Sequence, residues 1–135
     1  MIFFQLFPRV RWSRKGRSSC KKKRKGYFAH KETARATILS RLHFWNAHYG
    51  LSWKRVSIRD TKSRWGSCSR IGNLNFSYRL IFLSQELLDY VVVHELCHLK
   101  EFNHSPAFWS HVAEMMPDWR ERRKALRTAS LDRFF

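Results

Sequence analysis

The stretch YVVVHELCHLKEFNHSPAFW, residues 90–109, decides the fold and carries the chemistry of this chain. If its first half is helical, His94 and His98 lie four residues apart on one face, so both imidazoles reach the same metal ion. Glu95 projects beside them, where a carboxylate can accept a proton from a metal-bound water. His104 follows six residues after His98 and supplies a third nitrogen. The pattern predicts a hydrolytic zinc site with one ion and an open fourth position.

Apolar residues around the motif argue against an exposed pair of solvated histidines. They are Tyr90, Val91, Val92, Val93, Leu96, Leu99 and Phe102, so the helix of about 85–102 is expected to be buried. Buried imidazoles beside a glutamate are costly unless they have a partner. Two hydrogen-bonded core histidines without a metal remain the structural alternative.

Two glutamates compete with His104 for the third ligand position. Glu101 lies three residues after His98 on nearly the same helical face, and Glu114 lies farther along the chain. A residue on the same straight helix reaches the third tetrahedral position poorly, which favours His104. Asn103 supports this choice, because asparagine tolerates the left-handed conformation that ends helices and lets the chain turn back.

Composition indicates one small domain that lies in a reducing compartment. The 135 residues are 44% hydrophobic, which is enough for one core. Cys20, Cys68 and Cys97 are odd in number and form no CxxC pair, which argues against disulfides and against a cysteine-built zinc knuckle. No run approaches the length of a membrane span, and the opening MIFFQLF is too short for a signal sequence. We therefore expect a cytoplasmic protein without a membrane partner.

Charge is concentrated at the start of the chain. Residues 1–26 hold ten Lys and Arg and no acid, and so supply +10 of the net charge of +17. Such a block cannot bury a core, so we expect a disordered basic tail before a domain of residues 27–135. The tail is either a passive solvated extension or a non-specific contact with nucleic acid through phosphates.

A helix and a strand are expected to open the folded part. Residues of about 31–49 place apolar side chains at helical spacing, and Gly50 ends that helix. The apolar positions are Ala34, Ile38, Leu42, Trp45 and Tyr49. In SWKRVSIRD, the alternation of Val56 and Ile58 predicts a strand with one buried face.

A hairpin and further helices are expected to follow. The hairpin has a strand near 63–69, a turn at 71–73 and a strand over 74–80. Ser84 is the expected N-cap of the helix that bears the histidines, and Ser105-Pro106 opens the next helix. Pro117-Asp118 then precedes a basic final helix. The order predicts an α+β fold with a small antiparallel sheet packed beside the metal-binding helix.

Residues Arg64 to Ser67, just before the hairpin turn, allow two interpretations. An edge strand here can pair with an extended peptide substrate, with Gly66 allowing close approach. Alternatively, Trp65 simply covers the sheet. The surrounding strands are basic, as expected for a substrate held near nucleic acid, although strands often carry one charged, solvated face. These basic residues are Lys54, Arg55, Arg59, Lys62, Arg64, Arg70 and Arg79, against the single acid Asp60.

Four separated blocks, RWGSC, LNFSYRLIFL, VVVHELCHL and NHSPAFW–MPDWRERR, resemble the YgjP-like zincin metallopeptidases over about residues 28–128. More distantly, the chain is similar to SprT-like and WLM-type zincins. The resemblance implies a zincin-like minimal core, a single zinc ion, and hydrolysis of a peptide or similar amide bond. It also implies His94, His98 and His104 as ligands and Glu95 as general base.

Two functions therefore remain open from the sequence. The first is a zinc metallopeptidase acting on a peptide or protein. The second is a non-catalytic nucleic-acid-binding module in which zinc is structural. A structural site closes its fourth position and has no use for an adjacent base, so Glu95 favours the enzyme. For the residue that stabilises the oxyanion, Tyr78, Arg79 and His111 are candidates by residue type alone.

Overall fold

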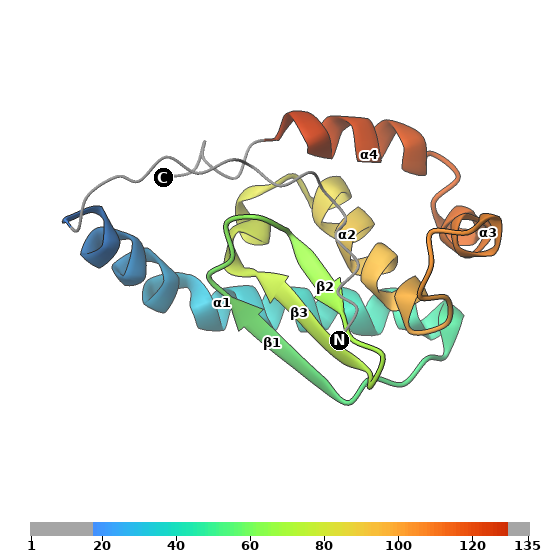
Figure 1. Cartoon of the computed structure of the whole chain (residues 1–135), viewed down its shortest axis with the longest axis horizontal. Coiled ribbons are helices and arrows are strands. Elements are labelled where there is room, and N and C mark those ends of the chain that lie inside the picture. Colours follow the sequence, from blue (N-terminus) through green and yellow to red (C-terminus); the bar gives the residue numbers. More distant parts are fainter. Residues whose placement is uncertain (1–17, 130–135) are drawn as a thin grey trace.

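The computed structural model describes residues 18–129, which form four α-helices, one short 3₁₀ helix and three strands. In chain order these are α1 (Ser18–Tyr49), β1 (Arg55–Arg59), β2 (Gly66–Cys68), β3 (Asn73–Ser77), η1 (Tyr78–Phe82), α2 (Gln85–His98), α3 (Pro106–Met115) and α4 (Trp119–Thr128). The sheet, α1 and α2 pack together, and α3 and α4 lie on the side of α2 away from the sheet (Figure 1). None of the described helices combines the length and hydropathy that a membrane span needs.

The α+β class is confirmed, but the sheet is mixed rather than wholly antiparallel. Its strand order is β1-β3-β2. The predicted hairpin pairs β2 with β3 in antiparallel fashion, with Gly66 opposite Phe76. The other edge of β3 pairs with β1 in parallel, with Val56 opposite Leu74. The expectation of an antiparallel sheet was wrong for β1, because its partner is not the next strand in the chain but the one after it.

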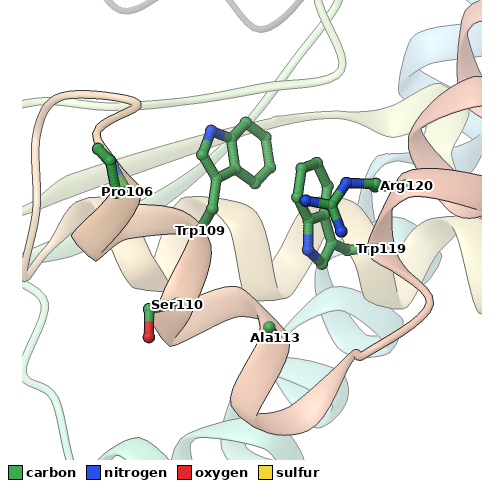
Figure 2. Close-up of a pocket in the computed structure, with 6 residues that line it drawn as sticks. All are labelled: Pro106, Trp109, Ser110, Ala113, Trp119 and Arg120. Atoms are coloured by element: carbon green, nitrogen blue, oxygen red, sulfur yellow. The ribbon is translucent and has the colours of Figure 1, made fainter.

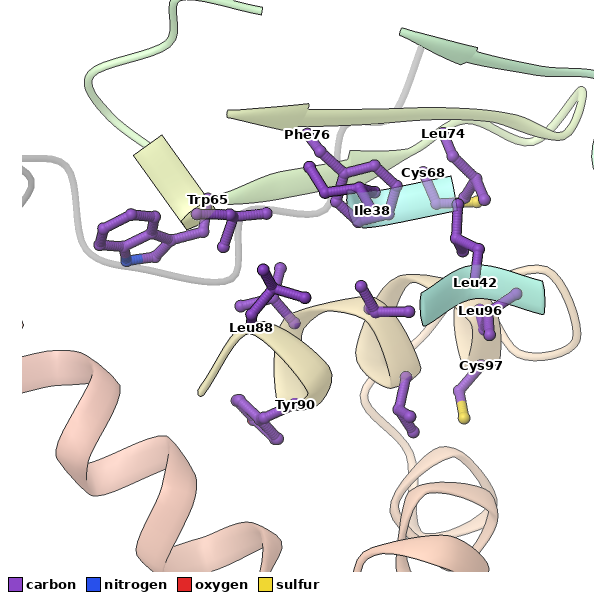
Figure 3. Packing of buried hydrophobic residues seen from close by; sticks show 14 of the residues in the cluster. Ile38, Leu42, Trp65, Cys68, Leu74, Phe76, Leu88, Tyr90, Leu96 and Cys97 are labelled. Atoms are coloured by element: carbon purple, nitrogen blue, oxygen red, sulfur yellow. The ribbon is translucent and has the colours of Figure 1, made fainter. Parts of the chain in front are cut away.

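The core lies between the inner face of the sheet and the two long helices. Ile38 and Leu42 of α1 meet Leu74 and Phe76 of β3 in this layer, and all four are fully buried (Figure 3). The predicted alternation of β1 is confirmed, since Val56 and Ile58 are its buried positions. α2 is buried on all sides from Leu88 to His98, because α1 and the sheet cover one side and α3 and α4 the other.

Polar bonds fix α1 against the rest of the fold. The guanidinium of Arg41 donates two hydrogen bonds to the carboxylate of Asp89 in α2, at 2.7 and 2.8 Å. At the end of α1, the Tyr49 hydroxyl donates to the carbonyl of His111 in α3 at 2.7 Å. Gly50 then takes a positive φ of 61°, which confirms the predicted end of this helix.

The start of α1 corrects an expectation. The helix begins at Ser18 rather than near residue 31, so residues 18–26, expected to be disordered, are helical. Lysine and arginine are good helix formers, and their charge did not prevent helix propagation from the packed part of α1. The remainder of the predicted tail, residues 1–17, lies outside the described residues.

Two predicted elements end earlier than expected. β3 ends at Ser77, where the serine hydroxyl accepts a hydrogen bond from the Arg79 N–H and starts η1. α2 ends at His98 rather than near 102. Ser84 occupies the N-cap position of α2 without a side-chain bond, whereas Ser105 caps α3 by accepting from the Phe108 N–H. The early end of α2 determines how the third histidine reaches the site.

Candidate metal centre and active site

Three histidines meet at the end of α2. His94 and His98 lie one helical turn apart, and their Nε2 atoms are 3.0 Å from each other. The Nε2 atom of His104 lies 3.1 Å from each of them. Within residues 18–129 this is the cluster of metal-ligand side chains that the structure brings together. The sequence-predicted triad is therefore assembled from a helix and the loop that follows it.

The triangle of nitrogens has the size that a zinc ion requires. Two nitrogens bound tetrahedrally to zinc at ~2.05 Å would lie roughly 3.3 Å apart. His98 also shows how its ring is oriented, because its Nδ1 lies 3.0 Å from the carbonyl oxygen of Glu101. A carbonyl only accepts, so Nδ1 carries the proton and Nε2 presents its lone pair to the other two rings. Three imidazole nitrogens that converge within 3.1 Å of one another are a donor set that zinc takes in proteins, so the residues fit a zinc ion.

The loop after α2 explains why His104 is the third member. Because α2 ends at His98, residues 99–105 turn back, and the carbonyl of Glu101 bonds the ring of His98. The carboxylate of Glu114 is engaged elsewhere, with His48 at 3.0 Å and His111 at 3.1 Å. Neither Glu101 nor Glu114 belongs to the cluster found among the described residues. The structure thus places His104, and neither rival, beside the helical pair.

Aromatic rings from α3 and α4 support the histidines. Phe108 stacks on the ring of His98 at 4.4 Å between centroids. Trp109 lies nearly parallel to the ring of His104 at 5.7 Å and stacks on Trp119 of α4 at 4.0 Å. Figure 2 shows the two indoles side by side, with the guanidinium of Arg120 over Trp119. The orientation of the exposed His104 therefore depends on α3 and α4.

Burial keeps the imidazoles neutral. His94 and His98 are almost inaccessible to solvent, and burial is the main reason that both pKa values fall. The pKa of His94 is held well below 6.5, and that of His98 is lowered to about 4. Burial and the nearby Arg123 also lower the pKa of His104. Neutral imidazole is the form that ligates metal, so the site is prepared for a cation at neutral pH.

Glu95 lies against the edge strand of the sheet. A Cβ added at Gly66 of β2 would stand 2.8 Å from the Oε1 atom of Glu95 and 2.9 Å from its Cγ atom. Real Cβ atoms do not approach so closely, so only glycine leaves room for this carboxylate. The sequence predicted that Gly66 allows close approach of a peptide substrate, whereas the group that approaches it in the structure is the side chain of Glu95. The adjacent Trp65 is 2% exposed, which confirms that it covers the sheet.

The carboxylate of Glu95 is buried without compensation. Glu95 is 1% exposed, and neither carboxylate oxygen has a hydrogen-bond partner among the described residues. Burial raises the pKa of Glu95 well above 4.5, and the positive charge of Arg64 partly opposes this shift. A carboxyl group with a raised pKa that bonds to nothing else is suited to taking up and returning a proton.

The three oxyanion candidates have other roles. Arg79 is buried and pairs with Asp60 at 2.9 Å, and Tyr78 packs edge-on to Tyr27 of α1. His111 pairs with Glu114. Two other residues, Tyr90 and Arg123, lie near the histidines. From the sequence, Tyr90 was expected only as an apolar neighbour of the motif, and Arg123 was not singled out.

Tyr90 precedes His94 by one helical turn, and the centroids of their rings are 5.9 Å apart. Its buried hydroxyl has no hydrogen-bond partner among the described residues. Arg123 of α4 lies over the ring of Trp109 and acts electrostatically on His94 and His104. The helical period could have identified Tyr90, whereas no local signal points to Arg123.

Comparisons with known proteins agree with this geometry. The family model described as "YgjP-like, metallopeptidase domain" matches residues 10–129. The match thus begins within the segment that we expected to precede the domain. The comparison with curated proteins gave no match.

A solved structure also resembles this chain. It is the metallopeptidase zymogen of Pyrococcus abyssi abylysin, with 26% sequence identity and a TM-score of 0.61. The similarity covers 67% of this chain and 92% of that one. Because the family model spans most of the sequence, including the histidine cluster and Glu95, the chain belongs to the YgjP-like metallopeptidase family.

Proposed function

We propose that this protein is a zinc-dependent peptidase in which His94, His98 and His104 hold one zinc ion and Glu95 is the general base. The observation that carries the proposal is the convergence of three Nε2 atoms within 3.1 Å at the end of α2. The same helix carries Glu95, whose carboxylate oxygens have no hydrogen-bond partner among the described residues. Membership of a metallopeptidase family supports a peptide or protein as the substrate.

Each residue of the site has a defined task. When bound, a zinc ion would supply Lewis acidity to the scissile carbonyl and to a water molecule. Glu95 accepts the proton of the attacking water on one carboxylate oxygen and returns it to the leaving amine nitrogen. Gly66 keeps the space that this carboxylate occupies. The edge of β2 not paired with β3 offers backbone groups with which an extended peptide can form hydrogen bonds.

A purely structural zinc is less well supported. Such a site has four protein ligands, and the cluster within residues 18–129 has three. A buried glutamate without partners would also be a pure cost to a structural site, because it destabilises the fold and binds nothing. A general base next to a zinc ion with an open coordination position would explain both the three-histidine cluster and the buried glutamate.

The test is a cleavage assay on protein whose metal content is known. Purified protein should contain one zinc per chain and cleave members of a peptide library. A chelator should abolish cleavage, and added zinc should restore it. Zinc-loaded, folded protein that cleaves no peptide would contradict the proposal.

A further inference from the structure

The outer face of the sheet carries a cationic groove, which we call the sheet groove. Its volume is about 370 Å³. It is lined by Arg55, Arg59, Thr61, Arg64, Ser67, Ser69, Asn73 and Asn75. Every lining residue is polar, three are arginines, and none is acidic. The groove lies outside the histidine cluster and shares no residue with it.

Strand alternation explains why these side chains share one face. In β1, Val56 and Ile58 point into the core, so Arg55 and Arg59 point the other way. In β3, Leu74 is buried in the core, while Asn73 and Asn75 point outward. Strand pairing places Asn73 beside Arg55 and Ser67 beside Asn75. The register of the sheet thus assembles polar groups from all three strands.

Hydrogen bonds organise the floor of the groove. The Nε of Arg59 donates to Oδ1 of Asn75 at 3.4 Å, and Nδ2 of Asn75 donates to Oγ of Ser67 at 3.3 Å. The Asn73 N–H donates to the hydroxyl of Ser69 at 3.1 Å. Ser67 and Ser69 are largely buried, so their positions are fixed by the sheet. The groove is therefore a preformed surface rather than a set of independent surface side chains.

Arg55 and Arg59 form no ion pair with a carboxylate of the described residues. The acid closest in sequence to the groove, Asp60, pairs with the buried guanidinium of Arg79 at 2.9 Å. Three arginines with serine and asparagine groups match the oxygens of phosphate, because guanidinium donates to phosphate in fork geometry. A net charge of +17 for the whole chain favours a polyanion as partner.

The length of the sheet groove and the residues that line it indicate which kind of anion it binds. Arg55 and Arg59 are four residues apart in an extended strand, which corresponds to roughly 13 Å. A chain of phosphates spans this distance with both side chains extended outwards, whereas one phosphate would require both side chains to bend towards a common point. The lining contains no aromatic ring on which a base could stack. We propose that the sheet groove binds the phosphate backbone of a nucleic acid without reading its sequence.

This proposal is independent of the peptidase function. Neighbouring residues of β2 face opposite sides, so Gly66 lies against Glu95 and Ser67 lines the groove. A nucleic acid in the groove would thus lie on the reverse side of the strand that borders the base. It would bring the peptidase close to proteins bound to the same nucleic acid.

The test compares two double variants of the full chain that each remove two positive charges. Arg55→Gln/Arg59→Gln changes the groove, and Lys124→Gln/Arg127→Gln changes exposed positions of α4 as the matched control. The probe is a fluorescent single-stranded oligonucleotide titrated by anisotropy at several salt concentrations. Circular dichroism and zinc content verify that both variants are folded.

The groove variant should bind about 10- to 50-fold more weakly at 0.1 M salt, and the magnitude of its log–log salt slope should fall by about 1.4, because each phosphate contact on a single strand contributes about 0.7. The α4 variant should remain close to the unchanged protein. Asn75→Asp, which puts an acid on the groove floor, should weaken binding without changing zinc content. Basic residues 1–26 are present in every protein compared and do not affect the contrast.

Two results would overturn the proposal. Equal losses in the groove and α4 variants, or no loss in either, would mean that general charge and not the groove binds nucleic acid. Competition by millimolar inorganic phosphate at constant ionic strength would reveal a site for one phosphate instead of a phosphate chain.

Discussion

Glu95 combines two properties that oppose each other. Its burial raises its pKa, and both carboxylate oxygens lack a hydrogen-bond partner within residues 18–129, which suits proton transfer. The same burial destabilises the fold whenever the carboxylate is charged. Each unit of pKa shift corresponds to ~1.4 kcal/mol, so a functional base here lowers the stability of the metal-free protein.

Gly66→Ala tests the contact between the edge strand and the base. The new Cβ would stand 2.8 Å from Oε1 of Glu95, so the carboxylate must move. Turnover should fall about 10- to 100-fold because small displacements of a reacting group are costly, while zinc content remains unchanged. Ser67→Ala, in the same strand but facing outward, is the control and should keep nearly full activity. Unchanged turnover in Gly66→Ala would show that the position of Glu95 does not matter.

A stability measurement separates this contact from a general effect on β2. In the Glu95 background, Gly66→Ala should lower the free energy of unfolding. Combined with Glu95→Ala, which empties the space, the same change should cost little. If Gly66→Ala lowered the free energy of unfolding equally with Glu95 and with Glu95→Ala, the strain would arise from another contact of β2.

The third ligand is tested by three single substitutions. His104→Ala should lower zinc affinity by at least about 100-fold, because two imidazoles alone hold the ion weakly. Glu101→Ala and Glu114→Ala should retain one zinc per chain, since these carboxylates lie outside the cluster of the described residues. Metal analysis after dialysis against a mild chelator checks all three. Loss of zinc in a glutamate variant with retention in His104→Ala would reverse the assignment.

At the scale of elements, α2 must be held firmly if it carries two of the proposed ligands and the proposed base. Its tie to α1 is the paired Arg41 and Asp89, and Asp89 is 5% exposed. Asp89 lies five residues before His94 and six before Glu95 on the same helix. The geometry of the pair is bidentate, so it fixes the rotation of α2 as well as its distance from α1.

Arg41→Ala should lower the free energy of unfolding by about 2–4 kcal/mol, because it leaves a buried carboxylate without its partner. The matched control is Arg35→Ala, which removes another arginine of α1. Arg35 pairs with the exposed Glu32 at 3.8 Å and donates one long hydrogen bond of 3.4 Å to the carbonyl of Val56, so its loss should cost clearly less than that of Arg41. Urea unfolding measures the free energy of unfolding of both variants. Equal losses in the two would mean that the Arg41–Asp89 pair does not anchor α2.

Elements with local periodicity were predictable from the sequence. The spacing of Ile38 and Leu42, the alternation in β1 and the serine before Pro106 each predicted the element that forms. The parallel pairing of β1 with β3 was not predictable, because it joins strands separated by another strand in the chain. Helical structure from Ser18 was missed because a run of like charge also fits disorder.

In the candidate site too, local patterns were predictable from the sequence and contacts between distant elements were not. HExxH and His104 follow from helical spacing and a turn, so the cluster of nitrogens was predictable. The contact between Gly66 and Glu95 and the approach of Arg123 join residues from different elements. Their sequence separation leaves no periodic signal, and only tertiary packing brings them together.

At the scale of the whole molecule, the histidine cluster connects all the helices after the sheet. Its three histidines lie on α2 and the following loop, and rings of α3 and α4 stack around them. A zinc ion bound only to the folded state would stabilise all of these contacts together. The stability of the metal-free protein should accordingly depend on the charge of the histidines.

The metal-free protein should lose stability as the pH falls from 6.5 towards 4. The pKa of His98 is lowered from 6.5 to about 4 in the folded state, so protons bind the unfolded chain more readily in this window. The neutral form of His98 therefore contributes stability above pH 6.5, and this stability is lost as the pH falls. The raised pKa of Glu95 has the opposite effect, because protonation of this carboxyl on acidification stabilises the folded state. The comparison therefore uses the Glu95→Gln background, in which this contribution is absent.

Thermal melts in chelator at several pH values measure this effect. In that background, the melting temperature should fall more steeply with acidification when His98 is present than in a His98→Ala variant. Identical pH profiles would show that His98 titrates equally in the folded and unfolded states.

The most direct test of the central claim is peptide cleavage by zinc-loaded protein and by its zinc-loaded Glu95→Gln variant. Glutamine has nearly the shape of glutamate but does not accept the proton, so turnover should fall by about two to four orders of magnitude at equal zinc content. Retained turnover in the variant would contradict the role of Glu95 as general base. Absence of cleavage by the zinc-loaded, unchanged protein would contradict the peptidase itself.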